Sequence, residues 1–262
     1  MNRLALLLVA VCLAACGGTP REASSPATPS AAVIAPSFGE ADPHDWDGRR
    51  PSAYPVHGSD VSRYQTSVDW RKARQNGVNF VFVKATEGAD DVDPMFREHW
   101  RGARSAGIPT GAYHFWYHCA TGKVQAQNFI AKVPRAGGAL PPVLDLEWTP
   151  FSPTCTRRPP QDELLREAQD FIDRVAAHYG QRPLVYVSPD IFEARELWRL
   201  QRVDFWARSV ADHPSKVYPN LRWTFWQYSG TGIIPGIAGK ADLNVFAGSR
   251  SDWADWLAAR SR

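Results

Sequence analysis

Hydrophobic and polar positions change between two periods along the chain. Extended apolar runs, typical of strands in a covered sheet, lie at 57–61, 80–85, 110–117, 142–148 and 184–188. Each run is followed by a segment with apolar residues at helical spacing, namely 68–75, 94–105, 124–133, 161–179 and 191–200. Strands that alternate with helices in this way predict a parallel sheet with right-handed crossovers.

The alternation stops after residue 200. Three further strand-like runs, at 204–209, 223–228 and 242–245, have no good helix between them, and an amphipathic helix at 252–259 ends the pattern. Eight strands are enough to close a barrel around its own side chains. We therefore predict an α/β fold, a TIM-like incomplete β/α barrel with eight strands and five helices. In such barrels the chemistry lies at the carboxyl ends of the strands.

The first residues have the character of an export signal. Residues 1–15 combine Arg3, an apolar stretch and small residues, and the segment Leu-Ala-Ala-Cys that ends at Cys16 resembles a bacterial lipoprotein signal. We expect Cys16 to carry the lipid; a plain secretory signal is the alternative. Residues 16–52 are rich in Ala, Pro and Ser and are predicted to be a disordered tether. The catalytic domain is then expected at 53–262.

The predicted compartment follows from this signal. We expect an exported, lipid-anchored protein, on the outer membrane facing the periplasm if the source is Gram-negative.

Two cysteines remain in the predicted domain, Cys119 and Cys155, and an oxidising compartment favours a disulfide between them over two free buried thiols. The formal charge is only +3, and no block of five basic residues occurs. We therefore expect no nucleic-acid partner. We also expect the protein to be a monomer.

Two acidic side chains interrupt the apolar run at 142–148. Asp145 and Glu147 point to the same face of a strand, with Cα atoms roughly 6.5 Å apart. Burial of two close carboxylates is costly and raises the pKa of one of them. Glycoside hydrolysis requires such a protonated acid beside a carboxylate. A structural pair neutralised by Lys or Arg, and a metal site shared with Asp60 and Asp242, are the alternatives. No His is placed with these acids, and we expect neither metal nor cofactor.

Polar side chains also stand at the ends of the other predicted strands. The acids and the remaining candidates for substrate binding are Asp60, Lys84, Glu87, Tyr113, Asp145, Glu147, Tyr186, Gln227, Tyr228 and Asp242. Because the carboxyl ends of parallel strands meet at one end of a barrel, we expect these side chains to converge there.

Five short motifs, in order and with similar spacing, resemble the family 25 glycoside hydrolases, the Chalaropsis-type lysozymes. They are GSDVSRYQ at 58–65, FVKATEG at 82–88, GAYHF at 111–115, PVLDLE at 142–147 and WQY at 226–228. The resemblance implies a β/α barrel and cleavage of the β-1,4 bond between N-acetylmuramic acid and N-acetylglucosamine in peptidoglycan. The glycan strands of peptidoglycan are then the expected partner.

The resemblance also implies roles for single residues. Glu147 matches the general acid, and Asp145 the residue that orients the 2-acetamido group of the substrate as that group attacks the anomeric carbon. Asp60 and Asp242 match two further acids of the site. The matching groove positions are Tyr113, Glu87, Gln227 and Tyr228. Two alternatives remain open: a hydrolase of another N-acetylated glycan such as chitin, and a non-catalytic wall-binding lipoprotein.

Overall fold

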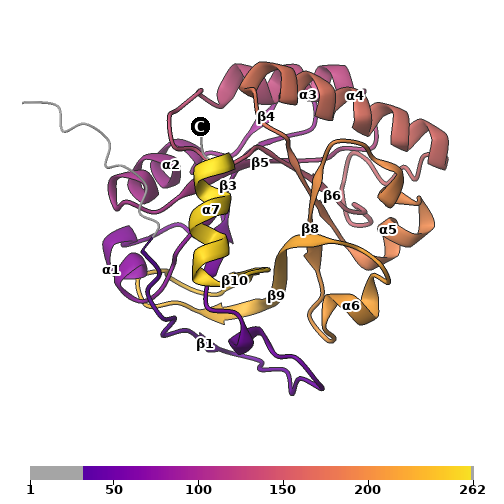
Figure 1. Ribbon diagram of the computed structural model, residues 1–262. Helices are drawn as coiled ribbons and strands as arrows, with labels where there is room; N and C mark the ends of the chain where they lie inside the picture. Colours follow the sequence, from indigo (N-terminus) through magenta and orange to yellow (C-terminus); the bar gives the residue numbers. More distant parts are fainter. Residues whose placement is uncertain (1–31, 261–262) are drawn as a thin grey trace, which may run out of the picture.

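A closed barrel of eight strands forms the centre of the computed structural model, which describes residues 32–260 (Figure 1). Consecutive barrel strands from β2 to β9 run parallel, and the pairing of β8 with β9 is part of the closure. The last strand, β10, is antiparallel to both of its neighbours, β9 and β2. The barrel strands are β2 (His57–Val61), β3 (Val81–Glu87), β5 (Thr110–Phe115), β6 (Val143–Leu146), β7 (Leu184–Val187), β8 (Asp204–Arg208), β9 (Trp223–Ile233) and β10 (Ala241–Phe246). The predicted eight-stranded barrel is confirmed.

Helices follow each of the first five barrel strands, as expected. They are α1 (Trp70–Gln75), α2 (Phe96–Ser105), α3 (Gly122–Lys132), α4 (Gln161–Tyr179) and α5 (Pro189–Ala194), and α7 (Arg250–Arg260) ends the fold. The segment 191–200 is not one helix, because Glu196 adopts a left-handed conformation (φ 50°) between α5 and the 3-10 turn η2 (Leu197–Arg199). An unexpected short helix, α6 (Pro214–Val217), lies between β8 and β9. Four residues are too few to show a helical period.

Aromatic side chains fill the interior of the barrel. Trp253 of α7 packs against Phe80 and Phe225 at ring-centroid distances of 5.5 and 6.4 Å, so α7 plugs the end where most strands begin (Figure 1). Nearer the carboxyl ends of the strands, Phe82 packs on Trp206 with the ring centroids 4.8 Å apart. A Cβ on Gly58 would lie 2.4 Å from the carbonyl oxygen of Phe80, so this interior position requires glycine. The packed interior forms the floor beneath the opposite, carboxyl end.

The chain upstream of the barrel does not match the expected tether throughout. Within residues 32–52, Ile34 exchanges backbone hydrogen bonds with the Asn79 side chain, and β1 (Gly39–Glu40) pairs with β9. Trp46 is buried, and its ring centroid lies 5.0 Å from that of Trp226. The ordered part therefore begins before residue 53, because a few apolar side chains in a Pro- and Ala-rich segment find partners on the barrel. The predicted signal peptide and Cys16 lie outside the described residues.

Three further features complete the fold. Cys119 and Cys155 form a disulfide, with Cα atoms 5.9 Å apart, which joins the loop after β5 to the loop after β6. The predicted pairing is confirmed. Within residues 32–260, none of the helices combines the length and the apolar character that a membrane crossing requires. A second short strand outside the barrel, β4 (Asp91–Val92), pairs with β3.

Candidate active site

A cavity of about 360 Å³ opens at the carboxyl ends of the barrel strands. Its lining brings together all four predicted acids and four of the six predicted substrate-binding residues. The lining residues are Asp60, Ser62, Tyr64, Lys84, Tyr113, Phe115, Asp145, Glu147, Tyr186, Trp206, Arg208, Gln227 and Asp242. They come from all eight barrel strands and the loops that follow them, so the fold concentrates their chemistry at one end.

Two predicted residues lie outside this lining. Glu87 does not line the cavity but contacts a residue that does: its Oε2 accepts a 2.7 Å hydrogen bond from Nζ of Lys84. Tyr228 points to the other side of β9 from Gln227, because successive side chains of a strand alternate between faces. Its hydroxyl lies 3.1 Å from Nδ1 of His57. The prediction that Tyr228 contacts substrate is not supported by this position, whereas Glu87 can act through Lys84.

A hydrogen-bonded network fixes the side chain of Asp60 on β2. Oδ1 of Asp60 accepts from Nδ2 of Asn244 at 2.8 Å and from Nε2 of Gln227 at 3.1 Å. Each amide is held in turn: the Tyr186 hydroxyl donates to Gln227 at 2.9 Å, and the Trp206 indole donates to Asn244 at 2.9 Å. Residues of four other strands thus orient one carboxylate, and two N–H donors favour its charged form.

Asp242 of β10 shares a proton with Asp60. The two residues are register partners across antiparallel strands, and a hydrogen bond links their side chains. Burial and the nearby Asp60 raise the pKa of Asp242 to about 9. Burial also raises the pKa of Asp60, but the amide donors oppose that shift. We conclude that Asp242 carries the proton at neutral pH and donates a hydrogen bond to Asp60.

Asp145 presents an unsatisfied oxygen to the cavity. Its Oδ1 is buried and has no hydrogen-bond partner among residues 32–260. Burial, reinforced by the charge of Glu147, raises the pKa of Asp145 well above its usual range. The backbone around it is fixed, since Trp116 N–H donates to the carbonyl oxygen of Asp145 at 2.9 Å. A buried acceptor without a donor is costly, so this oxygen is suited to an N–H group of a ligand.

Glu147 stands one residue beyond β6, on the same side as Asp145. Burial raises the pKa of Glu147, and the positive charge of Arg208 opposes this shift. His118 holds the local backbone, with Nε2 2.9 Å from the carbonyl oxygen of Glu147. A half-buried glutamic acid with a raised pKa can donate a proton near neutral pH, which is the property of a general acid.

Five lining residues were not predicted: Ser62, Tyr64, Phe115, Trp206 and Arg208. Two of these, Trp206 and Arg208, are two residues apart at the end of a predicted strand, so the alternation that identified Asp145 and Glu147 contained this signal as well. Tyr64 lies on a loop, where its side chain is 81% exposed. Because side chains on a loop do not alternate between two faces, the sequence alone could not place Tyr64 in the cavity.

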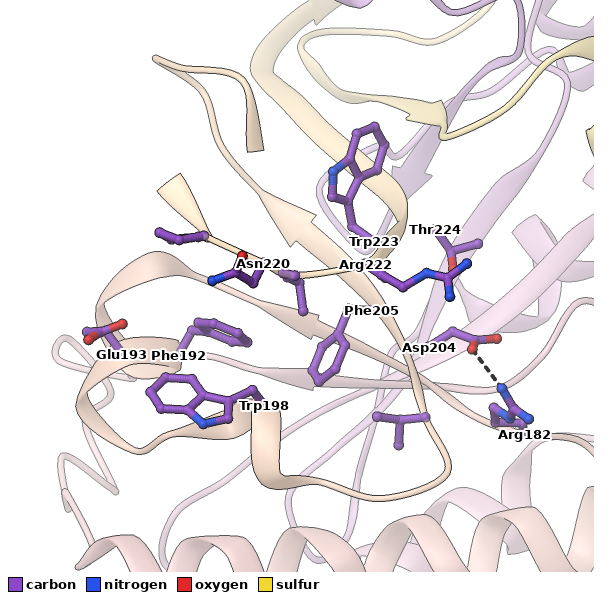
Figure 2. A pocket seen from close by; sticks show the side chains of 13 residues that line it. Arg182, Phe192, Glu193, Trp198, Asp204, Phe205, Asn220, Arg222, Trp223 and Thr224 are labelled. Carbon is purple, nitrogen blue, oxygen red and sulfur yellow. Dashed lines mark hydrogen bonds and ion pairs between the residues drawn. The ribbon is translucent and has the colours of Figure 1, made fainter. Parts of the chain in front are cut away.

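A larger cavity, about 940 Å³, lies where β7, β8 and β9 begin, at the opposite end of the barrel (Figure 2). Trp198 and Phe205 line it from η2 and β8. Asp204 in this cavity is neutralised by Arg182 at 3.2 Å and by Arg260 at 3.1 Å. It therefore holds no pair of unneutralised carboxylates. Nowhere in residues 32–260 do three or more His, Cys, Asp or Glu side chains take an arrangement that could hold a metal ion.

Comparison with known proteins places the same residues in a family. The family model described as glycosyl hydrolases family 25 matches residues 59–237, which include Asp60, Asp145 and Glu147. Lysozyme M1 of Streptomyces globisporus is 32% identical over 209 residues, covering 74% of this chain and 68% of that protein. The uncharacterized protein YegX of Escherichia coli K12 is 33% identical over 208 residues, covering 77% and 73%. A family 25 glycosyl hydrolase structure from Bacillus anthracis superposes with a TM-score of 0.74 at 32% identity, covering 82% of this chain and 99% of that one.

Proposed function

The chain belongs to glycosyl hydrolases family 25, and from this premise we propose that it is a peptidoglycan muramidase. It is a glycoside hydrolase, and the proposed bond is the β-1,4 link between N-acetylmuramic acid and N-acetylglucosamine. The observation that carries the proposal is the pair Asp145 and Glu147 on one face of β6, both with a raised pKa, in the cavity at the carboxyl end of the barrel.

The first step breaks the glycosidic bond with help from the substrate itself. The carbonyl oxygen of the 2-acetamido group attacks the anomeric carbon of N-acetylmuramic acid, while Glu147 gives its proton to the departing O4 of N-acetylglucosamine. The free Oδ1 of Asp145 accepts the acetamido N–H, which orients the group and stabilises the positive charge that develops on it. This substrate-assisted route is a known exception to schemes with two catalytic carboxylates.

The second step regenerates the enzyme. Glu147, now a carboxylate, accepts a proton from water as the water oxygen attacks the anomeric carbon and opens the cyclic intermediate. The product has a free reducing end on N-acetylmuramic acid, and Glu147 recovers its proton. Asp60 and Asp242 together hold one negative charge beside the reacting sugar, because their shared proton prevents a second one.

Substrate choice tests this proposal. Purified peptidoglycan and chitin oligomers are incubated with the protein, and the products are reduced with borohydride and identified by mass spectrometry. Reduced muramic acid ends from peptidoglycan, with intact chitin, support a muramidase. Cleaved chitin supports a hydrolase of other N-acetylated glycans, and peptidoglycan that is bound but uncut supports the non-catalytic alternative.

We further propose that the protein is exported and lipid-anchored at Cys16, on the outer membrane facing the periplasm if its source is Gram-negative. The support is the lipoprotein-like segment that ends at Cys16, and we propose that the catalytic domain acts as a monomer on glycan strands near the membrane. Cys16→Ser should move the protein from the membrane fraction to the soluble fraction. Retention of this variant in the membrane fraction contradicts the anchor, and a dimer mass in sedimentation contradicts the monomer.

A further inference from the structure

We propose that Arg208 is a carboxylate-binding residue of the substrate cleft, which recognises an acidic group on the muramic acid side of the glycan. The proposal rests on the muramidase function above and names a substrate feature for the same site. N-acetylmuramic acid differs from N-acetylglucosamine by a lactyl ether that ends in a carboxyl group. That carboxyl is either free or linked to a peptide with carboxylates of its own, so both forms offer an anion to a nearby cation.

The position of Arg208 carries the inference. It is the last residue of β8, lies in register with Gln227 of β9 and lines the cavity, where its charge acts on both Glu147 and Asp242. The backbone at this point is fixed, because the Tyr218 hydroxyl donates a 2.7 Å hydrogen bond to the Arg208 carbonyl oxygen. The side chain is half-buried, which gives it a defined place without closing it to solvent.

The guanidinium of Arg208 acts on Glu147 and Asp242 through its charge alone. Within residues 32–260 it donates no hydrogen bond and takes part in no ion pair. The other cation of the cavity differs, since Lys84 is paired with Glu87 at 2.7 Å and its Nζ lies 4.4 Å from the ring centroid of Phe115. Five N–H donors on a planar fork are therefore left for a ligand, and this fork matches a carboxylate in bidentate geometry.

The acidic side chains near Arg208 do not form ion pairs with it in the described part of the chain. The acidic groups whose charges act in the same region are Glu147, Asp242, Asp190, Asp60 and Asp145. Asp242 keeps its proton at neutral pH, and Asp190 binds the Ser188 hydroxyl at 2.6 Å. Glu147 must be protonated to act as the acid, and it is neutral in that state. Asp60 is held by Asn244 and Gln227, and within residues 32–260 none of these acids forms an ion pair with Arg208, so its guanidinium can bind an anionic substrate group.

A competing explanation assigns Arg208 only to Glu147, whose pKa it lowers. The two explanations differ in their dependence on substrate. A residue that acts on the general acid affects every substrate equally and moves the pH profile. A residue that binds a substrate carboxylate affects only substrates that have one, and it acts mainly on KM.

The test compares Arg208→Met and Arg208→Lys in the full chain on three substrates: peptide-bearing peptidoglycan, glycan strands stripped of peptide with the lactyl carboxylate free, and the same strands with that carboxylate methyl-esterified. Arg222→Met is the matched control, because it removes an exposed arginine from the cavity at the opposite end of the barrel. Thermal unfolding confirms that each variant folds. We expect Arg208→Met to lower kcat/KM on carboxylate-bearing substrates by about 10- to 100-fold, mainly through KM. Arg208→Lys should recover part of this loss.

The comparison between substrates decides the outcome. If the loss on stripped strands disappears after esterification, the lactyl carboxylate is the ligand. If the loss occurs only on peptide-bearing material, the ligand is a peptide carboxylate. An equal loss on all three substrates, with a shifted pH profile, overturns the proposal in favour of an effect on Glu147. If the unmodified protein cleaves none of them, the muramidase function itself fails, which is a distinguishable result.

Discussion

Asp242 donates a hydrogen bond to Asp60 where β10, the last strand of the barrel, pairs antiparallel with β2, the first. The acceptor is fixed by two amide donors, from Gln227 and Asn244. A single charge is therefore held in a buried site where two would repel. The strands that close the barrel thus also set the charge of the cavity. The pair should make the free energy of unfolding depend on pH.

Stability should fall as the pH rises between about 4 and about 9, in part because of Asp242. Its pKa is 3.8 without burial and about 9 in the fold, so the folded state binds more protons than the unfolded state in this window. By linkage, the contribution of the residue is complete below the lower value and is lost as pH rises through the upper one. Asp242→Asn keeps an N–H donor toward Asp60 but does not titrate, so it should flatten this slope.

Urea unfolding at pH 5 and pH 8 measures the effect. The difference in unfolding free energy between the two pH values should shrink in Asp242→Asn, by at most about 1.4 kcal/mol per pH unit. Asp255→Asn, at an exposed position on α7, is the control and should retain the original slope. An unchanged slope in Asp242→Asn contradicts the shared proton.

Substitution of Asp145 by Asn should lower the activity without lowering the stability of the fold. Its buried Oδ1 lacks a partner in the described part of the chain, so Asp145→Asn removes an unfavourable charge and should leave the melting temperature equal or higher. The neutral amide stabilises the developing positive charge poorly, and kcat should fall by about 10²- to 10³-fold. Steady-state kinetics and thermal unfolding of the same variant measure both effects. A variant with normal kcat shows that Asp145 does not act on the acetamido group.

The segment 32–52 should contribute to stability although its composition is that of a tether. A chain that begins at residue 53 loses the β1–β9 pairing, the hydrogen bonds between Ile34 and Asn79, and the buried Trp46. Burial of one tryptophan accounts for about 3 kcal/mol or more. Chemical unfolding of chains that begin at 32 and at 53 should differ by at least this amount, and Trp46→Ala in the longer chain should reproduce most of it. Equal stability of the two chains indicates that the segment contributes nothing.

The disulfide should stabilise the loops at the rim of the cavity. It closes a loop with a sequence separation of 36, which corresponds to about 4 kcal/mol in the chain-entropy account. Cys119→Ser combined with Cys155→Ser should lower the unfolding free energy by up to that amount. A thiol reagent applied to denatured, unreduced protein that begins at residue 32 should find no reactive thiol. Two reactive thiols show that the bridge does not form in the isolated protein.

The two periods of apolar residues were sufficient to predict the barrel, because buried parallel strands and the helices that cover them differ clearly in spacing. The alternation of side chains on β6 likewise located Asp145 and Glu147. Tyr228 shows the limit of motif reasoning: the WQY motif placed it in the groove, but its neighbour Gln227 faces the cavity, so Tyr228 must face away.

Other features depend on contacts that no local pattern contains. The order in residues 32–52 depends on partners such as Asn79 and Trp226, which are distant in sequence. The network around Asp60 requires Asn244, which is recognisable only when β10 is placed beside β2. Arg208 was on a predicted strand, but its role depends on the lack of an intramolecular partner for its guanidinium within the described chain.

The central claim is that Glu147 donates the proton that breaks the glycan, and the most direct test is digestion of purified peptidoglycan by Glu147→Gln beside the unmodified protein. Glu193→Gln, in the cavity at the opposite end of the barrel, is the matched control. Muramic acid reducing ends are counted by mass spectrometry after borohydride reduction. We predict that Glu147→Gln folds normally and loses the formation of these ends by about 10²- to 10⁴-fold, while Glu193→Gln retains it. Muramic acid ends formed by Glu147→Gln at the original rate would contradict the account.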